Sequence, residues 1–213
     1  MSSRIHLSKD GRFYLIDGSR YSRVTDVISA TIRRKQLEEW KQRVGKEEAE
    51  RVANETSAYG ERLHEMLAWH DRGNMRMVDA MLRETIEFLP SVNVWSTWAT
   101  KWIKKWLIIE GILFSPKLRI AGRVDRVGEF KGDDAPCVGD FKTGTTVYDE
   151  TGIQLGLYKH IYNETHTPKA KRTLTFHLPR VDPGKLTIKE YVGKKYEESG
   201  LAAVKIFHTL HKK

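Results

Sequence analysis

The sequence predicts an α/β protein, with a mixed central β-sheet flanked by helices and a helical N-terminal half. Residues 118–130 are rich in Val, Ile and Arg and have the composition of a strand, and residues 137–142 resemble a short second strand. Turn-forming residues fill the segment 131–136 between them. No internal repeat or low-complexity linker interrupts the chain, so we expect a single domain over residues 1–213.

We expect this domain to have a mainly helical part over 1–110, which begins with a hairpin, and a catalytic sheet core over 111–213. Gly73 breaks one predicted helix and Pro90 ends the next. The expected elements, in chain order, are a hairpin over 4–16, a short helix from Tyr21, a long helix from Leu37 to about His70, helices over 75–89 and 92–109, strands over 118–130 and 137–142, a helix over about 149–163, a strand hairpin over 172–178 and 186–192, and a helix over 195–210.

Four tryptophans mark the predicted helix over 92–109. They are Trp95, Trp98, Trp102 and Trp106, and their spacing places them on one helix face. Such a stripe can stack single-stranded bases. A buried core face is the more common role of this pattern, and we favour it here.

The composition favours a polyanionic partner. The formal net charge is +9, which suits nucleic acid, although many proteins are basic without binding it. The single cysteine, Cys137, excludes an intrachain disulfide and argues against a four-cysteine iron–sulfur cluster. The sequence shows no membrane-spanning or signal segment, so we expect no membrane partner and a cytoplasmic location.

The hairpin over 118–142 brings two acidic residues together. If its turn is centred on Gly132 and Asp133, Asp125 and Asp140 oppose each other, with Cβ atoms roughly 5 Å apart. Lys142 then shares the face of Asp140, and Phe141 points the other way into the core. Two such close carboxylates repel each other unless a cation lies between them, and a hard divalent ion such as Mg²⁺ or Mn²⁺ prefers oxygen ligands. The alternative is an ordinary hairpin with two surface aspartates.

The order and spacing of these residues resemble the motifs of the PD-(D/E)XK nuclease superfamily, in particular its RecB-like exonuclease branch. Residues 122–126 read Gly-Arg-Val-Asp-Arg, residues 140–144 read Asp-Phe-Lys-Thr-Gly, and Gln154 and Tyr158 form the Gln-x-x-x-Tyr of the following helix. Upstream, Gly60 and His64 match a Gly-x-x-x-His motif, in which the missing side chain of Gly60 lets the helix approach the site. The third motif has Asp where many members have Glu. The N-terminal region also resembles, more loosely, the mitochondrial genome maintenance exonuclease and related phage enzymes.

The resemblance implies a restriction-endonuclease-like core and a metal-dependent phosphodiesterase that acts on DNA. The expected catalytic residues are Asp125, Asp140 and Lys142. The expected ligands of Mg²⁺ or Mn²⁺ are His64, Glu110, Asp125, Asp140 and the backbone carbonyl of Phe141. The residues expected to bind substrate are Gln154, Tyr158, Arg123, Arg126 and Thr143. In this prediction Lys142 orients water or stabilises charge on the phosphate.

The predicted activity is that of an exonuclease in DNA recombination, repair or replication, in a phage or other mobile-element setting. One alternative is a structure- or site-specific endonuclease of the same superfamily, because dependence on DNA ends comes from the shape of the channel. The other is a catalytically silent DNA-binding module that accompanies recombination or replication proteins. The presence of Asp125, Asp140 and Lys142 argues against the silent module.

Overall fold

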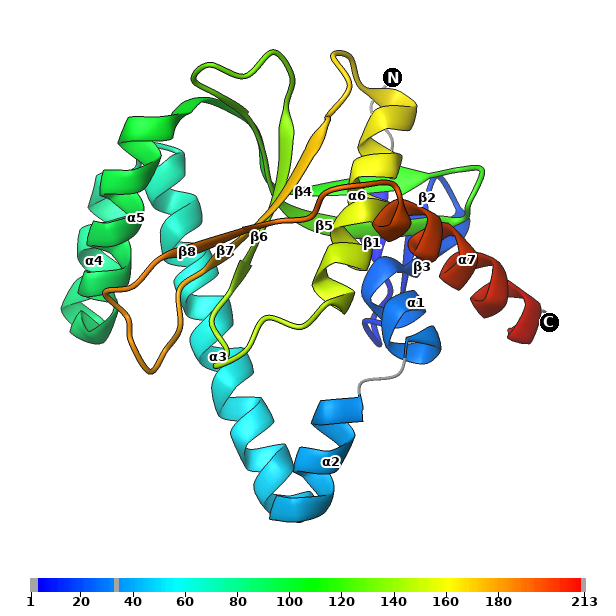
Figure 1. Cartoon of the computed structure of the whole chain (residues 1–213), viewed down its shortest axis with the longest axis horizontal. Helices are drawn as coiled ribbons and strands as arrows, with labels where there is room; N and C mark the ends of the chain where they lie inside the picture. Colours follow the sequence, from blue (N-terminus) through cyan, green and yellow to red (C-terminus); the bar gives the residue numbers. More distant parts are fainter. Residues whose placement is uncertain (1–3, 33–34, 212–213) are drawn as a thin grey trace.

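The computed structural model describes residues 4–32 and 35–211, and the fold is α/β as predicted (Figure 1). The strands are β1 (Ile5–Leu7), β2 (Phe13–Ile16), β3 (Ser19–Arg23), β4 (Ile103–Ser115), β5 (Ile120–Phe130), β6 (Cys137–Lys142), β7 (Arg172–His177) and β8 (Thr187–Glu190). The helices are α1 (Val24–Thr31), α2 (Lys35–Val44), α3 (Lys46–Asp71), α4 (Met75–Glu84), the 3-10 helix η1 (Ile86–Phe88), α5 (Leu89–Trp102), α6 (Glu150–Thr165) and α7 (Lys195–Leu210). None of the helices within these ranges has the length and apolar character needed to cross a bilayer.

The strands form one mixed sheet around β5. The hydrogen-bonded order is β1-β2-β3-β5-β6-β7-β8, and β4 pairs with β5 in addition. Because β4 runs antiparallel along the length of β5 and occupies one edge, β3 and β6 share the other edge. There β3 pairs with Ile120 and Ala121, whereas β6 pairs with the segment that starts at Arg126. The stretch 122–125 therefore lies at the point where β3 and β6 diverge.

Helices cover the sheet in two groups. Figure 1 shows α4 and α5 on one side of the sheet and α1, α6 and α7 on the other. Leu63 of α3 and Trp95 of α5 belong to a buried cluster with Phe141 and Phe176 of the sheet. Val27, Leu155 and Val204, from α1, α6 and α7, belong to a second cluster. Helices of both groups therefore pack against the strands that carry Asp125 and Asp140.

The structure corrects several predicted boundaries. The helix predicted over 92–109 ends at Trp102, and residues 103–115 form β4, where Ile residues at 103, 108, 109 and 112 favour a strand. Pro90 lies in the first turn of α5 rather than after a helix, a position that proline tolerates. Gly45, with φ +87°, separates α2 from α3, so the long helix is two. Strand β3 was not predicted, and α1 starts at Val24 instead of Tyr21.

Part of the tryptophan stripe belongs to the buried core. Trp95 is fully buried and stacks on Trp98 and Trp106, with ring centroids 5.2 Å and 6.0 Å away. Trp106 reaches this cluster from β4 and not from the helix. Trp102 is 43% exposed, so the prediction of a core face is wrong for that residue.

Candidate active site

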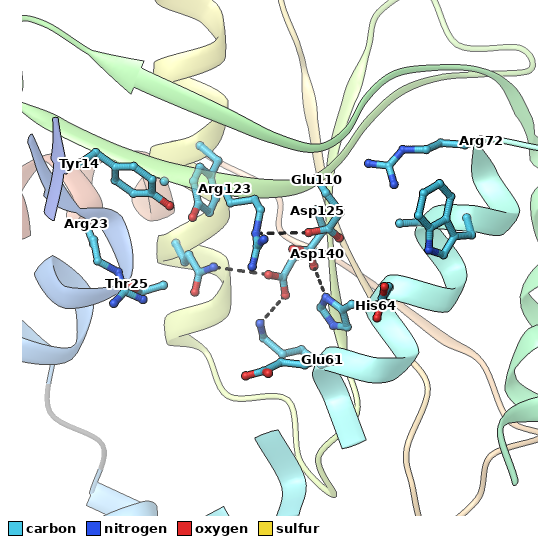
Figure 2. A pocket seen from close by; sticks show the side chains of 17 residues that line it. Tyr14, Arg23, Thr25, Glu61, His64, Arg72, Glu110, Arg123, Asp125 and Asp140 are labelled. Carbon is cyan, nitrogen blue, oxygen red and sulfur yellow. Dashed lines mark hydrogen bonds and ion pairs between the residues drawn. The ribbon is translucent and has the colours of Figure 1, made fainter. Parts of the chain in front are cut away.

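Most of the predicted site residues line one cleft of about 730 Å³ (Figure 2). Its wall combines side chains from α3, α6, β4, β5 and β6, and the first residues of α1 and the β2 strand close one end. The lining includes His64, Glu110, Arg123, Asp125, Asp140, Lys142, Gln154 and Tyr158. Residues far apart in sequence thus meet where β3 and β6 leave the edge of β5.

Asp125 and Asp140 face each other as the hairpin predicts. Arg126 pairs with Gly139 at the end of the β5–β6 ladder, and continuing this register by one residue places Asp125 opposite Asp140. The backbone N–H of Phe141 donates to Asp125 Oδ2 over 2.8 Å, which holds the carboxylate across the two strands. The Phe141 ring points away into the core, with its centroid 4.7 Å from that of Trp95. The register and the alternation of faces were both predicted correctly.

His64, Glu110 and Asp125 form a group suited to a metal ion. One ligand atom of each lies within 4.8 Å of those of the other two, and His64 Nδ1 is 3.5 Å from Asp125 Oδ2. The close approach of α3 depends on Gly60, where an added Cβ would lie 3.1 Å from Thr143 Oγ1. A group of two carboxylates and an imidazole fits a divalent cation, because each residue offers a lone pair to the same space.

Glu110 reaches this group from the middle of β4. The register Ile109 with Arg126 and Gly111 with Val124 places Glu110 beside Asp125. Its φ of +52° is a left-handed conformation that costs a non-glycine residue free energy, and such strain is typical of functional sites. Burial, and then the charge of Asp125, raises the pKa of Glu110 to about 7. A bound cation would favour the charged form of both carboxylates.

Asp140 is turned towards a lysine and an amide. Lys142 Nζ lies 2.6 Å from Asp140 Oδ2, and Gln154 Nε2 donates to Asp140 Oδ1 over 3.4 Å (Figure 2). Burial raises the pKa of Asp140 to about 6, and the charge of Asp125 adds to this shift, whereas Lys142 opposes it. Burial favours the neutral form of Lys142, but the Asp140 and Asp125 carboxylates outweigh it and raise the pKa of the ammonium. Lys142 is therefore a cation next to the carboxylates.

Two of the residues expected to bind substrate lie elsewhere. Arg126 is fully buried, because its side chain points away from its neighbour Asp125 and onto Phe141, with Cζ 4.9 Å from the ring centroid. Thr143 is buried against Gly60 under α3, outside the set of described residues that line the cleft. Both side chains are buried outside the cleft lining, so the structure does not support a substrate contact for either of them.

The other three residues expected to bind substrate do line the cleft. Arg123 has a side chain 64% exposed, and its Nε lies 3.5 Å from Glu110 Oε2. Tyr158 is buried under Gly122, where an added Cβ would be 2.5 Å from the tyrosine Oη. Gly122 is thus required for Tyr158 to pack against β5, and Gln154 lies one helical turn before it.

One residue that supports the site, Asp71, was not identified from the sequence. Asp71, at the end of α3, accepts hydrogen bonds from Arg126 Nε over 2.7 Å and from Trp95 Nε1 over 2.9 Å. Arg126 Nη1 in turn donates to Glu110 Oε1 and to the Asp125 carbonyl, over 3.1 Å and 2.7 Å. The sequence could have predicted that Arg126 points away from the cleft, because successive side chains along a strand face opposite sides and Asp125 faces the cleft. Nothing in the sequence spacing indicates Asp71.

The cleft thus combines opposed aspartates, a lysine two residues after the second and a histidine on a nearby helix. The sequence model of the PD-(D/E)XK nuclease superfamily matches residues 27–205, and the chain belongs to this superfamily. Its members are nucleases that use divalent metal ions, and the mixed sheet with helices on both sides is consistent with their restriction-endonuclease-like fold.

Two similar solved structures share little sequence with this chain. A protein from Eubacterium rectale described as a candidate exonuclease shares 10% identity over 70% of this chain and 64% of its own, with a TM-score of 0.48. A protein named SSO0001 shares 13% identity over 90% of this chain and 76% of its own, with a TM-score of 0.44. This chain therefore spans less than two thirds of the first of these proteins. No curated protein matched the sequence.

Proposed function

We propose that this protein is a Mg²⁺- or Mn²⁺-dependent deoxyribonuclease of the RecB-like branch that degrades DNA from its ends. The observation that carries the proposal is the meeting of Asp125, Asp140 and Lys142 with His64 and Glu110 in a single cleft. The superfamily supplies the reaction class, which is phosphodiester hydrolysis. The assignment to the branch rests on the motifs at 60–64, 122–126, 140–144 and 154–158, and the preference for ends rests on the resemblance to the exonucleases of that branch.

In this proposal His64, Glu110, Asp125 and Asp140 hold the metal, with the Phe141 carbonyl as a further ligand. The donor set fits because two carboxylates and an imidazole converge within 4.8 Å. Burial, and to a lesser extent the charge of Asp125, raises the pKa values of Glu110 and Asp140, and a bound cation would favour the charged form of both carboxyl groups. When bound, the ion would lower the pKa of a water molecule and polarise the scissile phosphate.

The protein's own residues position the substrate. Lys142, fixed by Asp140 at 2.6 Å, presents a positive charge where the phosphate gains negative charge. The exposed guanidinium of Arg123 is available for a phosphate oxygen, since arginine suits such contacts. Gln154 holds the orientation of Asp140, and Tyr158 forms part of the cleft wall. The setting that we propose is DNA recombination, repair or replication in the cytoplasm.

The test uses end-labelled linear single-stranded and double-stranded DNA beside a covalently closed circle, with Mg²⁺, Mn²⁺ or EDTA. We expect metal-dependent loss of linear DNA alone, its abolition in Lys142→Ala, and full activity in Lys117→Ala, a control in an exposed lysine away from the cleft. Cutting of the circle would make the protein an endonuclease. No cutting with either metal, together with retained salt-sensitive binding, would overturn the proposal in favour of a binding module.

A further inference from the structure

We propose that the cleft takes a single strand of DNA, held at its two ends by two aromatic–arginine pairs, Trp69 with Arg72 and Tyr14 with Arg23. All four residues line the cleft, and this inference rests on the proposed function. Figure 2 shows Tyr14 and Arg23 on one side of Asp125 and Asp140, and Arg72 on the opposite side. The carboxylates therefore lie between two surfaces that can hold a strand on either side of the bond to be cut.

The first pair lies at the end of α3. The Arg72 guanidinium carbon is 5.4 Å from the Trp69 ring centroid, and Arg72 Nη2 donates to the Ile109 carbonyl over 3.1 Å. This hydrogen bond holds the Arg72 guanidinium beside Glu110. Among the described residues, it uses one of the five N–H groups of the guanidinium. Arg72 lies eight residues beyond His64, about 12 Å along the helix axis. A stacked strand rises about 3.4 Å per nucleotide, so this distance corresponds to roughly three or four nucleotides.

In the second pair, Arg23 lies where β3 passes into α1, and Tyr14 lies on the neighbouring strand β2. Arg23 pairs with Ala121 in the sheet, four residues before Asp125, a distance of about 13 Å along β5. Arg23 Nη1 donates to the Gly11 carbonyl over 2.7 Å, which anchors the arginine to the hairpin that carries Tyr14. Tyr158 lies between this pair and Asp125, because it packs on Gly122. The two pairs are therefore at similar distances from the acidic group.

These features favour a single strand over a duplex. A single strand exposes the faces of its bases, which stack on aromatic side chains while cations contact its phosphates. A duplex keeps those faces inside and would offer Trp69 and Tyr14 no base on which to stack. The exposed acids Glu61 and Glu65 also line the cleft, and they would repel the phosphates of a second backbone.

The experiment measures binding by fluorescence anisotropy, in EDTA and in the Lys142→Ala background so that nothing is cut. The probes are a labelled oligothymidylate, an abasic oligonucleotide of the same length, and a blunt duplex. The variants are Trp69→Ala, Trp69→Phe and Arg72→Gln. The matched controls are Trp102→Ala and Arg83→Gln, which change exposed residues outside the cleft.

We expect the single strand to bind more tightly than the duplex. Trp69→Ala should weaken oligothymidylate binding on the order of tenfold, with little effect on the abasic probe, and Trp69→Phe should restore most of the loss. Arg72→Gln should weaken binding to both single-stranded probes and reduce the slope of log K against log salt by about 0.7. The controls should bind like the parent protein.

Equal loss on both probes for Trp69→Ala, or a loss that Trp69→Phe does not restore, would overturn the stacking role. Duplex binding as tight as that of the single strand would overturn the inference as a whole. The nuclease proposal is judged separately, by cleavage. A wild-type enzyme that cuts DNA while Trp69→Ala binds normally refutes only the strand path, whereas tight single-strand binding without metal-dependent cutting refutes only the nuclease.

Discussion

Arg126 and Asp71 form a buried ion pair behind the cleft, with Arg126 Nε 2.7 Å from Asp71 Oδ2 and side chains only 0% and 1% exposed. The same arginine contacts Glu110 Oε1 over 3.1 Å, so the pair joins the end of α3 to β5 and to a proposed metal ligand on β4. A residue that was expected to contact DNA instead holds the acidic side chains in place.

Breaking this pair should destabilise the protein strongly. Arg126→Met leaves the Asp71 carboxylate buried without its cation, and such a loss costs about 3–5 kcal/mol. Urea unfolding followed by tryptophan fluorescence measures the change in free energy. The double variant Asp71→Asn with Arg126→Met should lose less than the sum of the single losses, because the two residues interact directly. Additive losses would show that the pair is not coupled.

Lys142→Ala should lower kcat for DNA cleavage by at least about 10²–10³-fold, so that no loss of end-labelled DNA is detected, because removal of one group that stabilises transition-state charge has this effect. Lys142→Arg should not restore it, because the planar guanidinium cannot occupy the position of a compact ammonium beside Asp140. Single-turnover cleavage assays measure the rate constants of both variants. Wild-type kcat in Lys142→Arg would show that only the positive charge matters.

Mn²⁺ should bind more tightly than Mg²⁺, and His64→Ala should reduce this difference in affinity. Mg²⁺ prefers oxygen ligands, whereas an imidazole nitrogen suits the transition metals better. We expect His64→Ala to weaken Mn²⁺ binding by about tenfold or more, as measured by calorimetry. His6→Ala, in the exposed strand β1, is the control. Unchanged Mn²⁺ affinity in His64→Ala would remove this residue from the ligand set.

Cys137 should be unreactive in the folded protein. Burial raises the pKa of its thiol well above the usual value, so little reactive thiolate forms near neutral pH. Iodoacetamide at pH 8 should label the protein slowly until denaturant unfolds it, and mass spectrometry counts the adducts. Rapid labelling under native conditions would contradict the buried position of this strand residue.

Local chemistry made part of the fold predictable from sequence. The bounds of β6 and of α7 match their predictions because turn residues and apolar periodicity mark both ends. The hairpin register follows from the short turn around Gly132, and it placed Asp125 opposite Asp140. Gly60 was predicted to let α3 approach the site, and the 3.1 Å that would separate an added Cβ from Thr143 Oγ1 agrees with that role.

Tertiary contacts decided the features that could not be predicted. Tryptophans at helical spacing suggested a helix through Trp106, although β4 begins at Ile103 because it pairs with β5 along its length. Glu110 therefore reaches the site from a strand. The buried position of Arg126 depends on its ion pair with Asp71, which is 55 residues away in sequence. No local sequence pattern indicates such a pair.

In our proposal, the group around Asp125 binds a metal ion and cuts DNA. The most direct measurement is the rate of single-turnover cleavage of a labelled oligonucleotide as Mn²⁺ is titrated, for wild type and Asp125→Asn. We predict a saturable rate that EDTA abolishes and that Asp125→Asn lowers at every Mn²⁺ concentration by at least about a hundredfold. Cleavage that persists in EDTA, or an equal rate in Asp125→Asn, would contradict the account.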